Sequence, residues 1–263
     1  MRVALTGGAT GIGAEVAARL KRDGHEVTAF DISKPAANVD HWIRIDLSDP
    51  ASVSAAVSEA DGPYDALINN AGLPPREGQA ELVLNVNFLG FRQFLIGMLD
   101  KMAKGAAIVN TASRAGAMWR DNLDEVTALM ALDTPAALPG FVARRKMNHV
   151  RAYNLSKEAV IVLTMAETEA LIARDLRMNS VSPAAVSTGI LDDFVSAFGE
   201  RVARNIARAG RAGLPGEVAD VIAFLAGPDS RWLKGIDIAI DGGMGAMAQA
   251  DLLDLPVGAL RVP

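Results

Sequence analysis

The chain has 263 residues, of which 50% are hydrophobic and 22% are charged, and its formal net charge is −5. The apolar fraction is enough for a full core and excludes a disordered chain, while the acidic balance argues against nucleic acid as an obligatory partner. With no Cys and three His, the sequence offers no disulfide, no cysteine nucleophile and no metal site. The first residues form too short an apolar run for a signal peptide, and no run reaches the length of a membrane span, so we expect a cytoplasmic protein.

Short apolar runs alternate with helical patterns along the chain. The predicted strands lie at 3–5, 27–30, 42–45, 66–68, 107–109, 177–181 and 236–240. Apolar residues at helical spacing predict helices at 12–20, 50–60, 80–103, 154–174 and 215–226. This alternation implies right-handed crossovers and predicts an α/β fold, a doubly wound parallel sheet of about seven strands. No linker divides the chain, so we expect residues 1–263 to form one domain.

One segment interrupts the alternation. Residues 117–150 separate the fifth strand from the next long helix, where a few residues would normally suffice. The spacing of apolar residues in this insert predicts one or two helices rather than a loop. After the last strand, residues 244–263 form a tail with the apolar residues Leu252, Leu253, Leu255 and Val257.

A glycine-rich segment links the first strand to the first helix. Gly7, Gly11 and Gly13 would let the backbone turn tightly and approach a pyrophosphate at the N-terminus of the helix. The glycines alone are equally compatible with a plain turn. The order of strand, glycine loop and helix is the one that a dinucleotide site requires.

Acidic residues end the next two strands. Asp31 could accept hydrogen bonds from both ribose hydroxyls and would repel a 2′-phosphate. Neither Thr10 nor Ile32 is basic, so the sequence favours NAD over NADP. Asp46 could accept a hydrogen bond from the adenine amine. The alternatives are that Asp31 caps a turn and that Asp46 is the N-cap of the following helix.

A tyrosine, a lysine and a serine form the candidate reacting group. Tyr153 and Lys157 are four residues apart on a predicted helix, so they project from one face. A phenol must lose about 3 pKa units, roughly 4 kcal/mol, to act as a base near neutrality, which a nearby ammonium and a positive nicotinamide could largely supply. Ser113 follows the fifth strand and could donate to a substrate carbonyl oxygen. Taken alone, Tyr153 and Lys157 could be a surface pair, and Ser113 could cap a helix.

Taken in order, these motifs resemble the short-chain dehydrogenase/reductase superfamily over essentially residues 1–245. The matching segments are 6–13 (TGGATGIG), Asp46-Leu47, 69–72 (NNAG), Asn87, Ser113, 153–157 (YNLSK), Ser182-Pro183 with Val186 and Thr188, and 240–243 (IDGG). The resemblance implies a Rossmann-type fold and an NAD-dependent oxidoreductase that interconverts a secondary alcohol and a ketone.

The resemblance also implies residue roles. Tyr153 would be the general acid/base, Lys157 would lower its pKa and bind the nicotinamide ribose, Ser113 would orient the substrate oxygen, and Asn87 would hold a water that links Lys157 to solvent. Asn87 could instead bridge helix backbone, and Pro183 could simply end a strand. The expected cofactor-binding residues are Gly7, Thr10, Gly11, Ile12, Gly13, Asp31, Asp46, Leu47, Asn70, Ala71, Gly72, Tyr153, Lys157, Pro183, Val186 and Thr188.

The chain departs from the family pattern in two places. Ala184 stands where the family usually has glycine, and Ser113 and Tyr153 are 40 residues apart, farther than in most members. A long insert is similar to the bacterial 3α-hydroxysteroid dehydrogenase/carbonyl reductase branch. In most relatives the helix of Tyr153 and Lys157, together with the helix at 80–103, packs against a second subunit in a tetramer. An insert beside that face would obstruct the contact, so the resemblance implies a homo-oligomer that is a dimer. The alternative is that the insert only roofs the substrate pocket.

We expect the substrate pocket to be formed by residues 114–120, the insert and residues 189–210. Apolar side chains there favour a hydrophobic substrate, steroid-like or aromatic, although they could equally be loop-packing core. These residues are Met118, Trp119, Ile190, Leu191 and Phe194. The alternatives are a polyol or sugar dehydrogenase, a non-catalytic dinucleotide-sensing protein, and a nucleotide-sugar epimerase, for whose added domain the chain is too short.

Overall fold

The structure is a computed structural model, and it describes residues 1–255. Seven strands form one sheet in the order β3-β2-β1-β4-β5-β6-β7, and every neighbouring pair is parallel. This confirms the predicted doubly wound sheet. The strands are β1 (Arg2–Thr6), β2 (Glu26–Asp31), β3 (His41–Arg44), β4 (Tyr64–Asn69), β5 (Met102–Thr111), β6 (Arg177–Pro183) and β7 (Asp237–Ile240).

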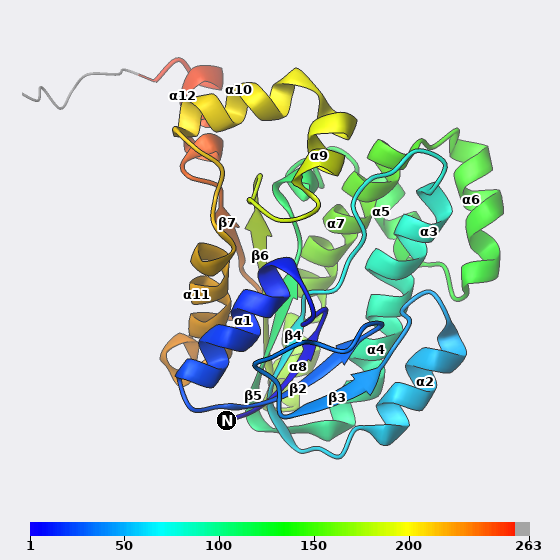
Figure 1. Cartoon of the computed structure of the whole chain (residues 1–263). Coiled ribbons are helices and arrows are strands. Elements are labelled where there is room, and N and C mark those ends of the chain that lie inside the picture. Colours follow the sequence, from blue (N-terminus) through cyan, green and yellow to red (C-terminus); the bar gives the residue numbers. More distant parts are fainter. Residues whose placement is uncertain (256–263) are drawn as a thin grey trace, which may run out of the picture.

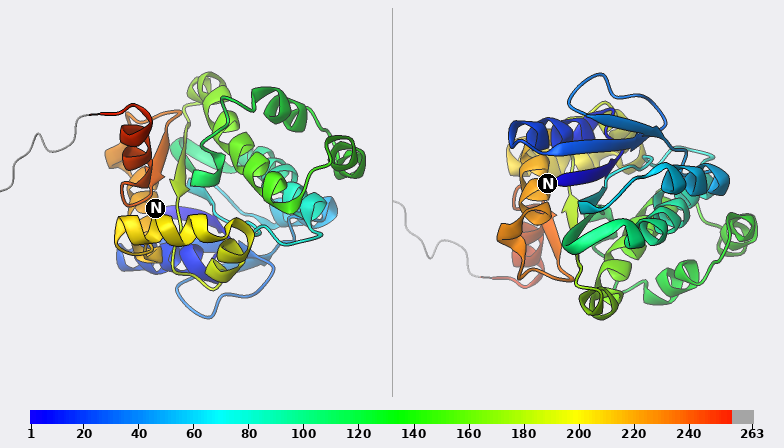
Figure 2. Two further views of the ribbon diagram at one scale, coloured as in Figure 1. Left: turned by 90° about the horizontal axis from the view of Figure 1, so that it is seen from above. Right: turned by 90° about the horizontal axis from the view of Figure 1, so that it is seen from below.

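Helices cover both faces of the sheet (Figures 1 and 2). α1 (Gly11–Arg22) and α11 (Pro215–Ala226) lie on one face, and α2 (Pro50–Glu59), α4 (Phe91–Met98) and α7 (His149–Ala166) lie on the other. Adjacent strand residues point to opposite faces, so Leu67 joins the core beneath α4 and Ile68 the core beneath α1. Burial on both faces explains why the strands read as continuous apolar runs.

The strands end at a common edge, where the functional loops gather. α9 (Leu191–Phe198) and α10 (Glu200–Ala209) cross above this edge (Figure 1). An ion pair between Arg208 and Asp251 joins α10 to α12 (Met244–Leu252). Val257 of the predicted apolar tail lies outside the described residues.

The predicted helix at 80–103 is wrong at its end, and the predicted strand at 107–109 is too short. Helical structure stops at Lys101, and β5 starts at Met102. The early part of β5 pairs irregularly with β4, with a register shift between Tyr64 and Ala66, which no local apolar pattern marks. The helical pieces are α3 (Ala80–Leu84), the π-helical turn η1 (Asn85–Gly90), α4 and the 3-10 turn η2 (Leu99–Lys101).

This stretch, Ala80–Lys101, has the length and hydropathy of a membrane span, with a mean hydropathy of 1.5. Its most apolar window is nevertheless 56% buried inside the protein. Phe88, Phe94 and Met98 are fully buried in the core cluster that covers the sheet. The stretch is therefore a core helix of the fold.

The helix that carries Tyr153 begins earlier than predicted, at His149 rather than 154. Asn148 is its N-cap, and the Asn148 Oδ1 accepts a hydrogen bond from the Arg151 N–H at 2.8 Å. The helical run then breaks at Glu167 and continues as α8 (Thr168–Ala173). The apolar pattern spans both pieces, so it predicted a single helix.

The insert forms two helices, as predicted: α5 (Leu123–Met130) and α6 (Leu138–Arg145), joined through the 3-10 turn η4 (Pro135–Ala137). α5 packs on α7, and α6 packs on α3 (Figure 1). Leu129 and Phe141 are buried in the same core cluster as α4 and α7. The insert is thus an integral outer layer of the helical side of the sheet.

Candidate active site

The glycine loop leaves no room for side chains. Gly7 has a φ of +72°, and a Cβ there would lie 2.7 Å from the Cα of Ala71. At Gly13 a Cβ would lie 1.8 Å from the carbonyl oxygen of Gly7. The bare backbone at the N-terminus of α1 is the cradle that a pyrophosphate needs, so these residues fit a dinucleotide. Gly11 faces Thr188, whose methyl group lies 3.6 Å from a Cβ built on the glycine, so the loop after β6 meets the cradle.

The segment after β4 connects this cradle to the reacting group. Thr6 Oγ1 accepts hydrogen bonds from the N–H groups of Asn70 and Ala71, at 3.0 and 3.1 Å. At Gly72 a Cβ would lie 3.2 Å from Asn87 Oδ1 and 3.5 Å from Lys157 Nζ. The structure thereby brings together residues that the sequence separates by more than 80 positions.

Asp31 caps a turn and also lies at the glycine loop, so its turn-capping alternative is confirmed. Its two carboxylate oxygens accept hydrogen bonds from the N–H groups of Ala9 and Ser33, both at 2.9 Å. The parallel pairing of β2 and β3 places Arg44 directly in register with Asp31. Neither Thr10 nor Ile32 is basic, but sheet pairing makes Arg44 a basic neighbour of Asp31, which no local stretch of sequence reveals.

Asp46 is not the N-cap of α2, so that alternative is wrong. The cap is Asp49, whose carboxylate accepts a hydrogen bond from the Ala51 N–H at 2.9 Å. The Asp46 carboxylate accepts from the hydroxyl and the N–H of Ser48, at 2.6 and 2.9 Å, and these bonds lower the pKa of Asp46. Leu47 is buried, and its carbonyl packs against Gly90.

Tyr153 and Lys157 are each 5% exposed, so the alternative of a surface pair is wrong. Lys157 Nζ lies 5.8 Å from the Tyr153 ring centroid and donates a hydrogen bond to the Thr111 carbonyl at 2.9 Å. Burial raises the pKa of Tyr153 to about 12, against a smaller lowering by its hydrogen bond with Ser113. Burial also lowers the pKa of Lys157 to about 8. The chain's own residues therefore move the pKa of the phenol away from neutrality.

Ser113 lies beside Tyr153 and also caps a turn, as the alternative allowed. Its hydroxyl accepts a hydrogen bond from the Ala115 N–H at 3.2 Å at the start of the 3-10 turn η3 (Arg114–Gly116). The same hydroxyl donates to the carbonyl of Pro183 at 3.5 Å, where β6 ends. Ala184 follows Pro183, and its backbone does not adopt the left-handed conformation, so this position does not require glycine.

Asn87 lies in the π-helical turn η1, a feature often found at functional sites. Its amide oxygen accepts from the Leu73 N–H at 2.7 Å, and its amide nitrogen donates to the Leu73 carbonyl at 3.0 Å. Asn87 therefore bridges backbone, but the backbone of the loop after β4 and not that of a helix, as the alternative expected. This bridge fixes the loop beside Lys157.

Two aromatic side chains from α9 pack against the Tyr153 ring. The ring centroids of Phe194 and Phe198 lie 5.3 and 6.5 Å from that of Tyr153, both edge-on, and the two phenylalanines stack at 6.3 Å. The sequence analysis named Phe194 but not Phe198, which its spacing of four residues along a helix could have revealed. Trp119 packs against the core, so the loop-packing alternative holds for that residue.

An ion pair holds α9 across the site. Arg76, in the loop after β4, donates through Nε and Nη2 to the two carboxylate oxygens of Asp193, at 3.1 and 2.9 Å. The insert, in contrast, packs on α3 and α7 from outside. The aromatic contacts to Tyr153 thus come from α9, and the composition of the substrate pocket stays a prediction.

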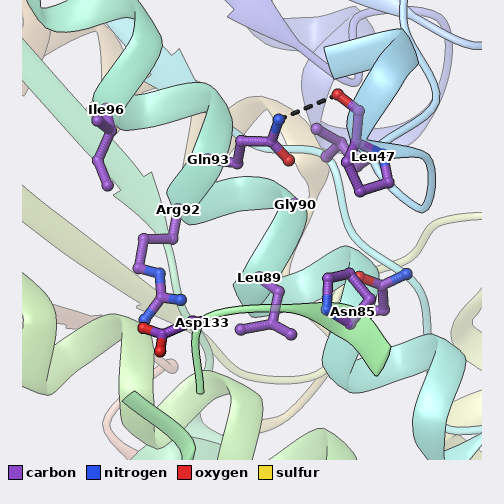
Figure 3. Close-up of a pocket in the computed structure, with 10 residues that line it drawn as sticks. Leu47, Asn85, Leu89, Gly90, Arg92, Gln93, Ile96 and Asp133 are labelled. Carbon is purple, nitrogen blue, oxygen red and sulfur yellow. Dashed lines mark hydrogen bonds between the residues drawn. The ribbon is translucent and has the colours of Figure 1, made fainter. Parts of the chain in front are cut away.

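A cavity of about 220 Å³ lies between α2, α4 and the insert (Figure 3). Two of its polar side chains are already engaged: Gln93 Nε2 donates to the Pro50 carbonyl at 3.0 Å, and Arg92 donates to carbonyls of the insert. None of Asn87, Ser113, Tyr153 and Lys157 lines it. Its lining residues are Leu47, Pro50, Asn85, Leu89, Gly90, Arg92, Gln93, Ile96, Asp133 and Pro135.

Comparison with known proteins agrees with this geometry. Residues 2–124 match the family described as short chain dehydrogenase, and residues 138–245 match a family described as Enoyl-(Acyl carrier protein) reductase. The chain is 34% identical to a coniferyl-alcohol dehydrogenase of a Pseudomonas species, over 92% of this chain and 96% of that protein. It is 28% identical to the 3-alpha-hydroxysteroid dehydrogenase/carbonyl reductase of Comamonas testosteroni, over 93% and 96%.

The structural comparison extends over the same length. The 3-alpha-hydroxysteroid dehydrogenase of Pseudomonas sp. B-0831, solved in complex with NADH, superposes with a TM-score of 0.83 and 32% sequence identity. The match covers 95% of this chain and 99% of that one. The chain therefore belongs to the short-chain dehydrogenase/reductase family, and it is an oxidoreductase that uses a nicotinamide dinucleotide.

Proposed function

We propose that the protein is an NAD-dependent dehydrogenase that interconverts a hydrophobic secondary alcohol, aromatic or steroid-like, with its ketone. The observation that carries this proposal is the stacked pair Phe194 and Phe198 beside Tyr153. A stacked aromatic pair at this position favours a ring-bearing substrate, because aromatic contacts stabilise planar apolar groups. The names of two relatives specify coniferyl alcohol and a 3-alpha-hydroxysteroid, both of which carry rings. The hydroxysteroid is a secondary alcohol that yields a ketone, whereas coniferyl alcohol is a primary alcohol that yields an aldehyde. A polyol or sugar remains the second candidate within the family.

The chain's residues would handle the proton of the substrate hydroxyl. Tyr153 would accept it during oxidation, and Ser113, which lies beside Tyr153, would orient the substrate oxygen. Because burial raises the pKa of Tyr153 to about 12, the phenolate needs positive charge close by. Lys157 supplies one such charge when protonated, and Asn87 would hold the water for proton relay. A bound oxidised nicotinamide would supply a second positive charge and the acceptor for the hydride.

The cofactor would lie along the carboxyl edge of the sheet. The loop with Gly7, Gly11 and Gly13 would hold the pyrophosphate, and the carboxylate of Asp31 would accept from the adenosine ribose and disfavour a 2′-phosphate. The remaining proposed contacts come from Thr10, Ile12, Asp46, Leu47, Asn70, Ala71, Gly72, Tyr153, Lys157, Pro183, Val186 and Thr188. We further propose that residues 1–263 work as one domain in the cytoplasm.

The proposal is tested by mixing the protein with NAD and, one at a time, coniferyl alcohol, a 3α-hydroxysteroid, 2,3-butanediol and glucose, and following NADH absorbance. We expect turnover of the ring-bearing alcohols and little with the others. Turnover confined to butanediol or glucose would establish the polyol alternative. Binding of NADH without turnover of any alcohol would indicate a dinucleotide-sensing protein. Parallel runs with NADP measure the cofactor preference.

The role of Tyr153 is tested separately with Tyr153→Phe. The variant keeps the ring that packs against Phe194 but lacks the proton-transfer atom. We expect the turnover rate to fall by about 10²–10⁴-fold, while NADH binding, followed by its fluorescence, stays close to that of the wild type. A variant that kept its rate would disprove the assignment of Tyr153 as the acid/base.

A further inference from the structure

A buried carboxylate lies on the back of the catalytic helix. Glu158 follows Lys157 directly, and its side chain is 1% exposed. At 3.6 residues per turn, Glu158 and Arg151 lie about 140° to 160° around α7 from Tyr153. The face that they share is the one on which the insert packs. A carboxylate buried there must be paired.

Side chains of the insert complete the pairing. Arg151 donates through Nη1 and Nη2 to the two oxygens of Glu158, at 2.9 and 2.7 Å. The Asn122 amide, just before α5, donates to the Glu158 Oε1 at 2.9 Å. Arg151 Nε donates to Glu125 of α5 at 2.7 Å. We call Asn122, Glu125, Arg151 and Glu158 the ionic cluster.

The ionic cluster has a specific geometry. Burial by itself would lower the pKa of Arg151, but its hydrogen bonds to Glu158 and Glu125 raise that pKa overall. A bidentate pair between guanidinium and carboxylate fixes both distance and orientation. A satisfied buried network of this kind makes its surroundings rigid.

The position of Arg151 matters because it stands in the first turn of α7. The first turn of a helix lacks part of its backbone hydrogen bonding, so it depends on caps and side-chain contacts for order. Tyr153 follows two residues later. A Cβ at Gly116 would lie 2.8 Å from the Lys157 carbonyl carbon and 2.9 Å from the Glu158 N, so the Ser113 loop touches the backbone of α7. Both that loop and the insert thus contact α7 within five residues of Tyr153.

We propose that the insert, through the ionic cluster, is a positioning device for Tyr153 and Lys157. Arg151 and Glu158 are positioning residues that act through the orientation of α7. This inference rests on the catalytic roles proposed above for Tyr153 and Lys157. A displacement of about 1 Å in a reacting group costs up to about a hundredfold in rate, so a less constrained α7 lowers turnover even in a fully folded protein.

The test removes both buried charges at once. Loss of one partner alone would leave an uncompensated buried charge and confuse unfolding with displacement, whereas replacement of a pair by apolar residues preserves stability. The main variant is therefore Arg151→Met with Glu158→Met. A second variant, Arg151→Lys, keeps the charge but loses the bidentate fork. The control is Arg174→Met with Asp100→Met, which removes an exposed ion pair at the opposite edge of the sheet.

Two measurements distinguish positioning from mere folding. Hydrogen exchange of the amides of residues 149–158 should accelerate at least about tenfold in the double variant, with α11 unchanged. The kcat for the best alcohol of the panel should fall about ten- to a hundredfold, with the KM for NAD changed less than about twofold. In both the exchange rates and the kcat, Arg151→Lys should lie between the double variant and the wild type. The control should match the wild type in both measurements.

The outcomes decide the inference. An unchanged kcat in a folded double variant would overturn it, since the cluster would then be structural only. Unchanged exchange at residues 149–158 would overturn it as well. If the wild-type protein turned over no alcohol, the proposed function would fail, while the exchange measurement would still decide whether the ionic cluster holds α7.

Discussion

Among single residues, Asp31 has two tasks, since its carboxylate ties Ala9 of the glycine loop and is proposed to select the cofactor. We predict that the wild-type protein prefers NAD and that Asp31→Ser narrows this preference by at least about tenfold, because like charges brought together cost several kcal/mol. The measurement is the ratio of kcat/KM with NAD to that with NADP. Equal efficiency in the unmodified protein would contradict the role of Asp31.

The neighbouring Arg44 provides a matched control for that experiment. It pairs in register with Asp31, and paired residues of adjacent parallel strands project to the same side of the sheet. Once Asp31 is gone, the guanidinium of Arg44 is free to attract a 2′-phosphate. We therefore expect Asp31→Ser with Arg44→Ala to gain less NADP activity than Asp31→Ser alone.

Lys157 is predicted to make stability depend on pH. Burial lowers its pKa to about 8 from 10.5, so between these pH values the unfolded chain binds more protons than the folded one. The free energy of unfolding therefore rises with pH across this window. Between pH 7 and pH 10.5, the free energy of unfolding of the wild type should rise by up to about 3 kcal/mol relative to that of Lys157→Met.

Urea unfolding of both proteins at several pH values measures this gain. Lys104→Met, at an exposed lysine, is the control for loss of a lysine charge. If the difference in free energy of unfolding between the wild type and Lys157→Met stayed constant with pH, burial would not lower the pKa of Lys157.

At the scale of elements, α9 is the segment whose position the reaction needs most. The Arg76–Asp193 ion pair holds it so that Phe194 contacts Tyr153. An exposed ion pair contributes about 0.2–1 kcal/mol, so we predict that Arg76→Gln raises the substrate KM by about two- to fivefold with little change in kcat. Steady-state kinetics with the best alcohol measures this split.

Salt and a control variant make the prediction about α9 specific. Added salt screens exposed charges, so it should raise the wild-type KM and leave the KM of Arg76→Gln almost unchanged. Arg19→Gln removes an ion pair with Asp220 between α1 and α11, away from α9, and should behave as the wild type. Identical KM values for Arg76→Gln and the wild type would rule out a role for this ion pair.

For the whole molecule, the insert bears on assembly. It covers the outer side of α3 and α7, and its exposed run Arg144-Arg145-Lys146 would be costly to bury at a subunit interface. We therefore predict a dimer rather than a tetramer. Light scattering across a dilution series measures the mass, and a tetramer that persisted on dilution would contradict this prediction.

The face formed by α11 and the edge strand β7 is available as the interface of the predicted dimer. Trp232, between α11 and the edge strand β7, is 90% exposed, and Phe224 of α11 is 45% exposed. Large exposed aromatic side chains of this kind often mark interfaces. We expect Trp232→Arg to shift the mass towards the monomer, whereas Ile96→Arg, at an exposed side chain of α4, should leave it unchanged.

Local spacing was sufficient to predict much of this protein. The alternation of apolar runs predicted seven parallel strands, because burial on both faces leaves a continuous apolar signature. The glycine loop and the Tyr153–Lys157 spacing are likewise local, and together with Asn87 and Ser113 they identified the family that the comparisons confirmed. The residue roles, the choice of NAD and the dimer stay predictions.

The rest depended on contacts between residues far apart in the chain. Sheet pairing makes Arg44 the neighbour of Asp31, and packing of α9 sets Phe198 beside Tyr153. Burial, which no sequence window reports, moves the pKa of Tyr153 upward rather than downward. The insert was predicted as helices, but only folding decided that it packs behind α7, because the ion pairs that hold it there form once tertiary packing brings Glu125 and Arg151 together.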